Sequence, residues 1–409
     1  MASTQAIERQ PVDAAGFARP GIADVEGARA SRAELAVDHA AIRHNVREIE
    51  QLAGGARVVG VIKGDAYGLG AVEVARTLRD AHVPAFAVDS VAEGLVLRAA
   101  GLEEPIVVLD GDTPDNAGAA VRWNLTPGIA HEELLYAYNA AAESAGVNRE
   151  VWVAANVGFN RSGYQDANRF ARFLRVAAAC RSLTVRCVYA HLTNAHAEDA
   201  VSRDQIACYQ RIVDVTRSTM GAAIETSLFA SHGIPRWSRE LQTDWVRPGL
   251  LLYGEHMFAP EQLDARLAAT MARFEPAVTL KARVVQVVEF ERADFVGYGR
   301  RHAVRAGQRL ATLSIGFGGG HPPGATRTIV SLGNRPRTTV GAVGMDAMQV
   351  DATAEPAPQR GDWAVLIGTI DGRRYGVTEL AQASGLSPYE FLSRLNCHRR
   401  HERPTMDRV

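Results

Sequence analysis

A lysine in a glycine-rich segment is the first residue of this 409-residue chain that could do covalent chemistry. The segment reads VIKGDAYGLG over residues 61–70, and Lys63 directly follows two apolar residues. A lysine that leaves a buried strand is partly desolvated, and desolvation favours the neutral amine that attacks carbonyl carbons. Taken alone, however, such a lysine is more often a solvated surface residue. Its surroundings must decide between the two interpretations.

Four further residues could take part in acid–base or anion-binding chemistry. His191 in YAHLTNA and Ser231 in ASHG each follow an apolar run, and Arg247 in VRPG lies within one. Tyr298 lies between two glycines in VGYG. Each also has a structural alternative: a core histidine, a loop serine, an arginine that holds a loop, and a tyrosine in a β-turn.

Short apolar runs separated by helical patterns must position these residues. Ile42, Val46, Ile49 and Leu52 recur at helical spacing, and the run 58–62 that follows is apolar on both faces, as buried parallel strands are. The remaining strand candidates are Ala85–Val88, Ile106–Leu109, Leu125–Ala130, Val151–Ala155, Val185–Tyr189, Ile224–Phe229 and Trp245–Tyr253. Eight strands alternating with helices predict a (β/α)8, TIM-like barrel. A doubly wound open sheet would give the same local pattern.

One of the intervening helices has clear end signals. It opens with Ser90 and Glu93, at the spacing of a capping box, and stops before Gly101.

The pattern changes after about residue 270. Val278, Leu280, Ala282 and Val284 alternate with polar or small residues, which is typical of a half-buried strand. Similar segments, divided by Gly- and Pro-rich turns, are Arg309–Phe317, Arg327–Leu332, Thr338–Asp351 and Trp363–Gly368, with one short helix at Thr378–Ser384. We therefore predict an α/β fold in which the barrel is followed by a mostly β C-terminal domain.

The predicted domain boundaries follow from these patterns. Residues 1–31 are expected to form a flexible leader, 32–265 the barrel, 266–396 the β-rich domain and 397–409 a flexible tail. The leader has no hydrophobic stretch and does not resemble a secretory signal, and no apolar run reaches the length of a membrane span. We expect a cytoplasmic protein with no membrane partner.

Composition excludes several other classes of partner. The net charge of −1 leaves no basic footprint for a nucleic acid. The four cysteines form no CxxC pair and no Cys/His spacing typical of a metal site, so we predict free thiols and no metal. They are Cys180, Cys187, Cys208 and Cys397.

The lysine segment resembles the cofactor-lysine motif of the alanine racemase family, roughly K-x-N/D-A-Y-G-x-G. The matching residues are Lys63, Asp65, Ala66, Tyr67, Gly68 and Gly70. The resemblance continues in register over about residues 36–395. It implies a fold-type III enzyme in which Lys63 carries pyridoxal 5'-phosphate and later acts as a base, with Tyr67 near the cofactor phosphate.

The same resemblance implies roles for other strand-end residues. His191 matches the histidine that stacks near the cofactor ring, and Arg247 matches the arginine that contacts the pyridine nitrogen. The residues that match phosphate-binding positions are Ser231, Gly249, Leu250 and Tyr389.

The β-rich domain supplies the second half of the resemblance. Tyr298 matches the opposing catalytic acid/base, which in the family reaches the active site of the other subunit. Met345 and Asp346, in GMDAMQVD, match the dimer-shared substrate site, and Arg161 matches the substrate-site arginine. The resemblance thus implies a homodimer with shared active sites, acting on a small-molecule amino acid by a two-base mechanism.

Some positions depart from the family pattern. Ala154 stands at the position of a lysine that is often carbamylated, and Asn156 and Phe159 replace an aspartate and a methionine. These features resemble the broad-specificity amino-acid racemases, in which an anion such as chloride takes the place of the carbamate. Three further departures reshape the expected entrance to the active site; they are Phe317, Gly319 and Ala342.

The sequence therefore predicts a pyridoxal-phosphate-dependent amino-acid racemase whose substrate is alanine or a broader set. Three alternatives remain open. They are a lyase of the same fold, aldolase- or decarboxylase-like, a non-catalytic pyridoxal-phosphate-binding protein, and a degenerate racemase. Tyr298 and Arg247 argue against the lyases. The extra β domain that carries Tyr298 argues against the non-catalytic binding protein. The retained pair of Lys63 and Tyr298 argues against the degenerate racemase.

Overall fold

The computed structural model describes residues 27–28, 32–109, 112–258, 260–324, 328–370 and 373–402. These residues form two compact units. The barrel unit comprises Ala36–Thr279 and Arg374–Leu395, with the described residues from His401 on. The sheet unit comprises the described residues up to Leu35, Leu280–Arg373 and Asn396–Arg400. The predicted leader, apart from residues 27–28, and residues 403–409 of the predicted tail lie outside the described residues.

Eight parallel strands close into a barrel, which rules out the open sheet. They are β2 (Arg57–Val61), β3 (Ala85–Val88), β4 (Ile106–Val108), β5 (Thr126–Ile129), β6 (Arg149–Ala154), β7 (Leu183–Tyr189), β8 (Glu225–Ala230) and β9 (Trp245–Arg247). Each coincides with a predicted strand. The last one is shorter than expected, because Pro248 has no N–H to continue the ladder and Leu250–Tyr253 turns into a 3₁₀ helix.

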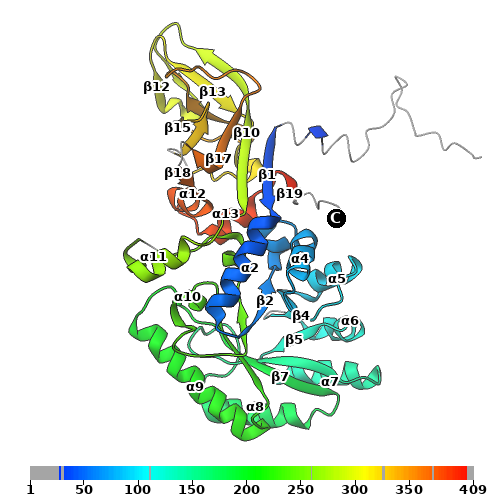
Figure 1. Cartoon of the computed structure of the whole chain (residues 1–409). Coiled ribbons are helices and arrows are strands. Elements are labelled where there is room, and N and C mark those ends of the chain that lie inside the picture. The colour runs from blue at the N-terminus through cyan, green and yellow to red at the C-terminus, as the bar shows by residue number, and fades with distance from the viewer. Residues whose placement is uncertain are drawn as a thin grey trace, which may run out of the picture. The chain divides into compact units, whose positions relative to one another are not determined.

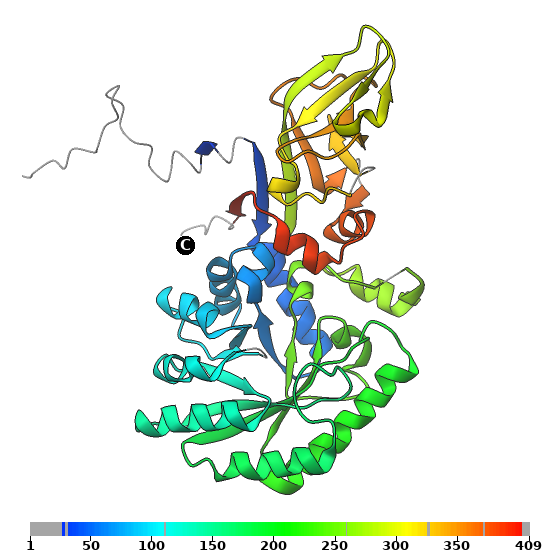
Figure 2. The same ribbon diagram turned by 180° about the vertical axis from the view of Figure 1, so that it is seen from behind.

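Helices form a layer around the barrel strands (Figures 1 and 2). Helix α2 (His39–Ala53) shows how the sequence sets their ends: Asp38 Oδ1 accepts from the amides of Ala40 and Ala41, at 2.8 and 3.1 Å, and Gly54 ends the helix with a φ of 62°. The others are α4 (Ala71–Asp80), α5 (Val91–Ala99), α6 (Ala117–Arg122), α7 (Glu132–Ser144), α8 (Ala167–Ala179), α9 (Ala200–Met220), α10 (Gly233–Trp237) and α11 (Ala265–Met271).

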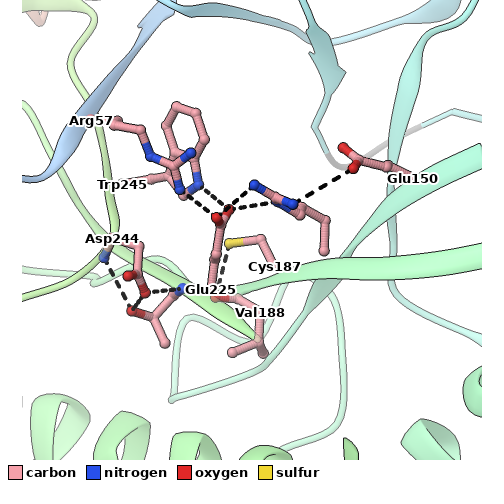
Figure 3. Close-up of polar contacts among 9 residues, drawn as sticks. Arg57, Glu150, Cys187, Val188, Glu225, Asp244 and Trp245 are labelled. Carbon is pink, nitrogen blue, oxygen red and sulfur yellow. Dashed lines mark hydrogen bonds and ion pairs between the residues drawn. The ribbon is translucent and has the colours of Figure 1, made fainter. Parts of the chain in front are cut away.

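A charged network joins neighbouring strands at their amino ends (Figure 3). The Glu225 carboxylate, at the start of β8, accepts from Arg57 at 2.5 Å and from the indole N–H of Trp245 at 2.7 Å. Arg186 of β7 also contacts it at 2.8 Å, and in turn lies 3.8 Å from Glu150. Because Arg57 lies on the first barrel strand and Trp245 on the last, this network holds the closure of the barrel.

The carboxyl end of β2 has an unusual backbone. The turn α3 (Lys63–Gly68) is left-handed at Gly64, Asp65, Ala66 and Tyr67, whose φ values are 53–60°. L-residues other than glycine avoid this region at a cost of about 1–2 kcal/mol each. At Gly68, where φ is 82°, an added Cβ would lie 2.8 Å from the carbonyl oxygen of Leu392, so glycine is required there.

The sheet unit contains a nine-stranded sheet in the order β18-β17-β14-β15-β16-β13-β10-β1-β19. Its strands are β1 (Ala33–Asp38), β10 (Val278–Glu289), β13 (Arg309–Leu313), β14 (Ile329–Leu332), β15 (Arg335–Val340), β16 (Met348–Asp351), β17 (Trp363–Ile370), β18 (Arg373–Tyr375) and β19 (His398–Glu402). A separate hairpin pairs β11 (Asp294–Val296) with β12 (His302–Val304). The four alternating apolar residues of β10 are all buried, as predicted.

Three segments differ from the sequence prediction. Residues 398–402, expected in the flexible tail, form strand β19, so that part of the tail prediction is wrong. The segment predicted as one strand from Thr338 to Asp351 is two, β15 and β16. Helices α12 (Val377–Ala383) and α13 (Pro388–Arg394) belong to the barrel unit, although we placed them in the β-rich domain. Polar segments and short helices carry little periodicity, and long-range contacts decide where they pack.

No helix among the described residues is long and apolar enough to cross a membrane.

Candidate active site

A cavity of about 600 Å³ opens at the carboxyl ends of the barrel strands. It brings together eight of the residues predicted from the sequence. They are Lys63, Tyr67, Arg161, His191, Ser231, Arg247, Gly249 and Tyr389. The last of these comes from α13, so the barrel unit builds this cavity from its strand ends and a helix far along the chain.

Lys63 lies at the end of β2 and faces a carboxylate. Its Nζ donates to Asp89 Oδ1 at 3.1 Å. The Lys63 side chain is 38% exposed, so it is less desolvated than its position after two apolar residues suggested. The amine therefore lies in the cavity beside a carboxylate, and is not buried in the barrel.

The left-handed turn after Lys63 places Tyr67 at the floor of the cavity. The Tyr67 ring lies edge-on to Tyr253, with centroids 6.0 Å apart, and 5.5 Å from the Tyr389 ring. Burial raises the pKa of Tyr67 well above its usual value, and the neighbouring tyrosines and carboxylates add to the effect. The residue opposite is Gly249, where an added Cβ would overlap the Tyr67 hydroxyl.

A polar cradle surrounds Ser231 at the end of β8. Its hydroxyl accepts from the amides of Gly249 at 2.9 Å and Leu251 at 3.3 Å. Burial raises the pKa of Tyr389 to about 12, although its hydrogen bond with Ser231 lowers it. Leu250 is completely buried next to this cradle and does not line the cavity.

Arg247 is a buried cation at the end of β9. Its guanidinium donates to the hydroxyl of Ser227, to the carbonyl oxygen of Ala190 at 2.5 Å, and stands 5.3 Å from the ring of Tyr189. The residue is only 4% exposed. A guanidinium held in this way is fixed in place and keeps its proton.

His191 lies at the end of β7 on another wall of the cavity. It meets the ring of Phe159 edge-on at 5.1 Å, and the Arg161 guanidinium lies 4.5 Å from the same ring. Phe159, one of the departures from the family pattern, therefore joins the two residues predicted to contact ring and substrate. Ala154, another departure, is buried at the end of β6.

Tyr298, Met345 and Asp346 belong to the sheet unit. Tyr298 is 79% exposed and Met345 is 58% exposed. Tyr298 lies close to the segment that carries Met345, since an added Cβ at Gly344 would be 3.9 Å from the Tyr298 ring. Phe317, whose amide donates to the Gly344 carbonyl oxygen at 3.0 Å, is also exposed.

A group of histidines on the cavity wall was not predicted from the sequence. His196 and His232 line the cavity, with rings 6.3 Å apart, and His256 stands nearby. The Nε2 atom of His232 accepts from the amide of Met257 at 2.8 Å. Burial, together with the neighbouring histidines, lowers the pKa of His232 to about 3, so the ring is neutral. Its place directly after Ser231, at a strand end, was the available signal.

The predicted capping box of α5 is only half formed. Ser90 Oγ accepts from the amide of Glu93 at 3.3 Å, as expected. The Glu93 carboxylate instead accepts from the amides of Gly64 and Asp89, each at 2.8 Å. The Glu93 carboxylate therefore links the end of β2 to the end of β3. The amide of Gly64 is available to it because this amide lies beyond the last residue of β2. Both Asp89 and Glu93 line the cavity, which the sequence analysis missed.

Among the described residues, no group of three or more His, Cys, Asp or Glu side chains is placed to hold a metal ion.

Two family models match the chain over most of its length. Residues 37–257 match the model described as "Alanine racemase, N-terminal domain", and residues 277–403 match "Alanine racemase, C-terminal domain". The chain belongs to the alanine racemase family. It is a racemase of this family, and the closed barrel followed by an antiparallel sheet agrees with the family fold.

Curated relatives support the same assignment. An alanine racemase of Yersinia pestis is 33% identical over 368 residues, covering 89% of this chain and 96% of the relative. A catabolic alanine racemase of Pseudomonas aeruginosa is 31% identical, with coverage of 89% and 96%.

Solved structures of alanine racemases share the fold. The enzyme of Streptomyces coelicolor superposes with a TM-score of 0.84 at 26% identity, covering 92% of this chain and 99% of that chain. The enzyme of Bartonella henselae, at 24% identity and a TM-score of 0.80, covers 91% and 99%; its structure carries covalently bound pyridoxal phosphate.

Proposed function

We propose that this racemase is a pyridoxal-phosphate-dependent alanine racemase that works as a homodimer. One observation carries the proposal: the Lys63 amine opens into the same cavity as the buried Arg247 and the cradle around Ser231. An amine, a fixed cation and an anion cradle are the groups that a phosphorylated aldehyde cofactor needs. The bound cofactor reported for the Bartonella henselae relative supports this choice.

The cradle fits a phosphate group. The hydroxyls of Ser231, Tyr67 and Tyr389 converge there, and the amides of Gly249 and Leu250 would add backbone donors. The close approach of Tyr67 to Gly249, where no Cβ fits, leaves the backbone accessible. We assign phosphate binding to these five residues.

The opposite part of the cavity fits the ring. We assign the pyridine nitrogen to Arg247, whose guanidinium keeps its proton and would leave that nitrogen unprotonated. His191, held edge-on to Phe159, would pack beside the ring. Lys63 would hold the cofactor covalently through Nζ.

When bound, the cofactor supplies a carbonyl that takes up the substrate amine and a ring that delocalises the electron pair left at Cα. Racemisation then requires only proton transfer at the two faces of Cα. Lys63 would remove or return the proton on one face through Nζ, and Tyr298 of the partner subunit would do so on the other through its hydroxyl. Arg161 would hold the substrate carboxylate by charge-assisted hydrogen bonds.

The exposed cluster of Tyr298, Phe317 and Met345 supports the dimer. Large apolar side chains gathered on a surface are typical of interaction sites. We propose that this cluster, together with Asp346, completes the substrate site of a second copy.

Alanine is the proposed substrate, because the curated relatives are named for it. A wider range is proposed from Ala154 and Phe159, which replace the lysine and methionine of the family pattern beside Arg161. Chiral chromatography of a panel of L-amino acids tests this: conversion of alanine alone would remove the wider range, and no conversion of alanine would remove the proposed substrate.

The chain allows a sharp test of Lys63, since it has only two lysines, Lys63 and Lys281. Borohydride reduction of the holoenzyme, followed by peptide mass analysis, should place the cofactor on Lys63. Lys63→Ala should lower racemisation by at least about 10⁴-fold, because both attachment and a base are lost. Lys281→Ala is the matched control, since Lys281 pairs with Glu34 at 2.9 Å in the sheet unit. Full turnover by Lys63→Ala would refute the proposal.

Subunit mixing tests the shared site. Lys63→Ala and Tyr298→Phe should each be inactive as homodimers. Because a mixed dimer would contain one intact site, random mixing should restore roughly a quarter of wild-type activity. Mixed dimers without recovered activity would show that the two residues do not act across subunits.

A further inference from the structure

The carboxylate of Asp89 is the contact that sets the direction of the Lys63 amine. Lys63 Nζ donates to Asp89 Oδ1 at 3.1 Å inside the cavity. The Asp89 side chain is 53% exposed, so its carboxylate keeps access to the cavity. No strand periodicity or helix cap requires a carboxylate at this position.

The backbone around the pair is held independently of the ion pair itself. One oxygen of Glu93 accepts from the amide of Gly64, next to Lys63, and the other accepts from the amide of Asp89, both at 2.8 Å. A single carboxylate therefore joins the two strand ends that carry the pair. The Asp89 side chain can be altered while this backbone link remains.

The other charged side chains of the cavity are placed differently. Arg161 lies over Phe159, and Arg247 donates to Ser227 and to backbone carbonyl oxygens. The carboxylate of Glu93 is occupied by backbone amides. Asp89 is thus the carboxylate of this cavity that contacts the amine.

We propose that Asp89 is a positioning residue that stabilises the protonated form of Lys63 Nζ during proton transfer. The inference rests on the proposed function. When neutral Nζ takes the proton from substrate Cα, the amine becomes an ammonium and the C–H electron pair remains with the substrate. The new positive charge then lies beside the Asp89 carboxylate, which exchanges no proton in this step. Return of that proton to Cα reverses the step, so no other reactant is needed.

Asp89→Asn tests the charge while keeping the shape of the side chain. Because the two enantiomers are equally stable, kcat/KM for L- and D-alanine must fall by the same factor, which we expect to be about 10- to 100-fold. The primary isotope effect with α-deuterated substrate should rise only for the enantiomer whose proton Lys63 removes. It should not rise for the other.

The one-sided rise of the isotope effect distinguishes a positioning residue from a residue with a purely structural role. A variant that merely folds badly or binds cofactor weakly would lose rate without a one-sided change in isotope effect. Asp89→Glu, which keeps the charge, should recover part of the rate. Asp80→Asn is the matched control, because the Asp80 side chain is 61% exposed, lies 3.3 Å from the guanidinium of its neighbour Arg79 and does not line the cavity.

The outcomes distinguish this inference from the proposed function. If Lys63→Ala is inactive while Asp89→Asn keeps wild-type rates and isotope effects, the role of Asp89 is refuted and the racemase proposal stands. If Lys63→Ala keeps full racemisation, the proposed function fails first. Cofactor content, measured by absorbance after reduction with borohydride, should remain at the wild-type level in Asp89→Asn; loss of cofactor without an isotope effect would also refute the role.

Discussion

At the amino ends of the barrel strands Glu225 contacts two arginines and an indole N–H, whereas at the carboxyl ends Asp89 contacts the Lys63 amine. The Glu225 side chain is 14% exposed and that of Asp89 is 53% exposed. Multiple short contacts suit a carboxylate that holds strands together. A carboxylate that has one cationic contact and is open to a cavity can interact with groups that bind in the cavity.

The backbone conformation also differs between the two ends of the barrel. The amino ends are regular parallel strands, while the carboxyl end of β2 runs into three consecutive non-glycine residues in the left-handed region. Strain of this kind persists only where surrounding structure holds it, and it gathers at functional sites. The barrel is therefore stabilised at one end and strained at the other.

The largest expected effect on stability is at the amino end. Glu225→Ala should lower the free energy of unfolding by about 2–3 kcal/mol, because two arginines and Trp245 lose their partner. This is less than for a fully buried pair, since the arginine side chains are 41% and 42% exposed. Chemical denaturation measures it. Glu150→Ala is the control: its carboxylate is 57% exposed and should cost under about 0.5 kcal/mol.

The difference between wild type and Glu225→Ala should also depend on pH. Burial alone would raise the pKa of Glu225, but hydrogen bonds from Trp245, Arg57 and Arg186 outweigh it and hold the pKa below its usual value. A carboxyl whose pKa is lowered by folding stabilises the fold above its unfolded pKa, near about 4.3, and loses this contribution as pH falls through the folded pKa. Equal losses at neutral and strongly acidic pH would contradict the ion-pair explanation.

A smaller effect is expected from the buried histidine at the carboxyl end. Folding lowers the pKa of His232 to about 3, so its neutral form contributes stability that is lost as pH falls from about 6.5 towards that value. Between pH 7 and pH 5, the free energy of unfolding of His232→Gln should therefore fall by about 1–2 kcal/mol less than that of the wild type. Denaturation at the two pH values measures it, with His82→Asn at an exposed position as the control. An unchanged pH dependence in His232→Gln would show that folding does not lower the pKa of this histidine.

The smallest effect concerns the strained turn. Ala66 and Ala75 are both completely buried, but Ala66 has a φ of 55° and Ala75 lies in the right-handed helix α4. Glycine at Ala66 relieves strain that glycine at Ala75 cannot, so Ala66→Gly should destabilise the protein less than Ala75→Gly, by about 1 kcal/mol. Equal losses in thermal unfolding would mean that the turn carries no strain.

Much of the barrel could be predicted from periodicity. The runs around Val58, Ala85 and Ile106 are short and apolar on both faces, and each forms a parallel strand. The end of the last strand could not be placed, because Leu250–Tyr253 is as apolar as the strand before it and only Pro248 breaks the pattern. Strand β19 is polar throughout and has no periodic signal, so pairing with β1 in the sheet decided its structure.

The cavity shows the same division. Lys63 could be singled out because it follows an apolar run in a glycine-rich segment, and His191 and Arg247 because their segments match the family pattern. The strand ends of a barrel meet at one face, so these residues were expected to lie together. Glu93 could not be assigned correctly, because its spacing from Ser90 fits a capping box and only the tertiary structure brings Gly64 within its reach. His232 was not predicted, because the family pattern at this strand end identifies its neighbour Ser231.

The order of residues along the chain determined which elements form and which of them carry amines, cations and hydroxyls, since these follow from local periodicity and side-chain chemistry. Tertiary structure alone decided that Asp89 meets Lys63, that Tyr389 reaches the barrel cavity from α13, and that His232 is neutral. Each of these depends on distances between segments far apart in sequence, and no local pattern encodes them.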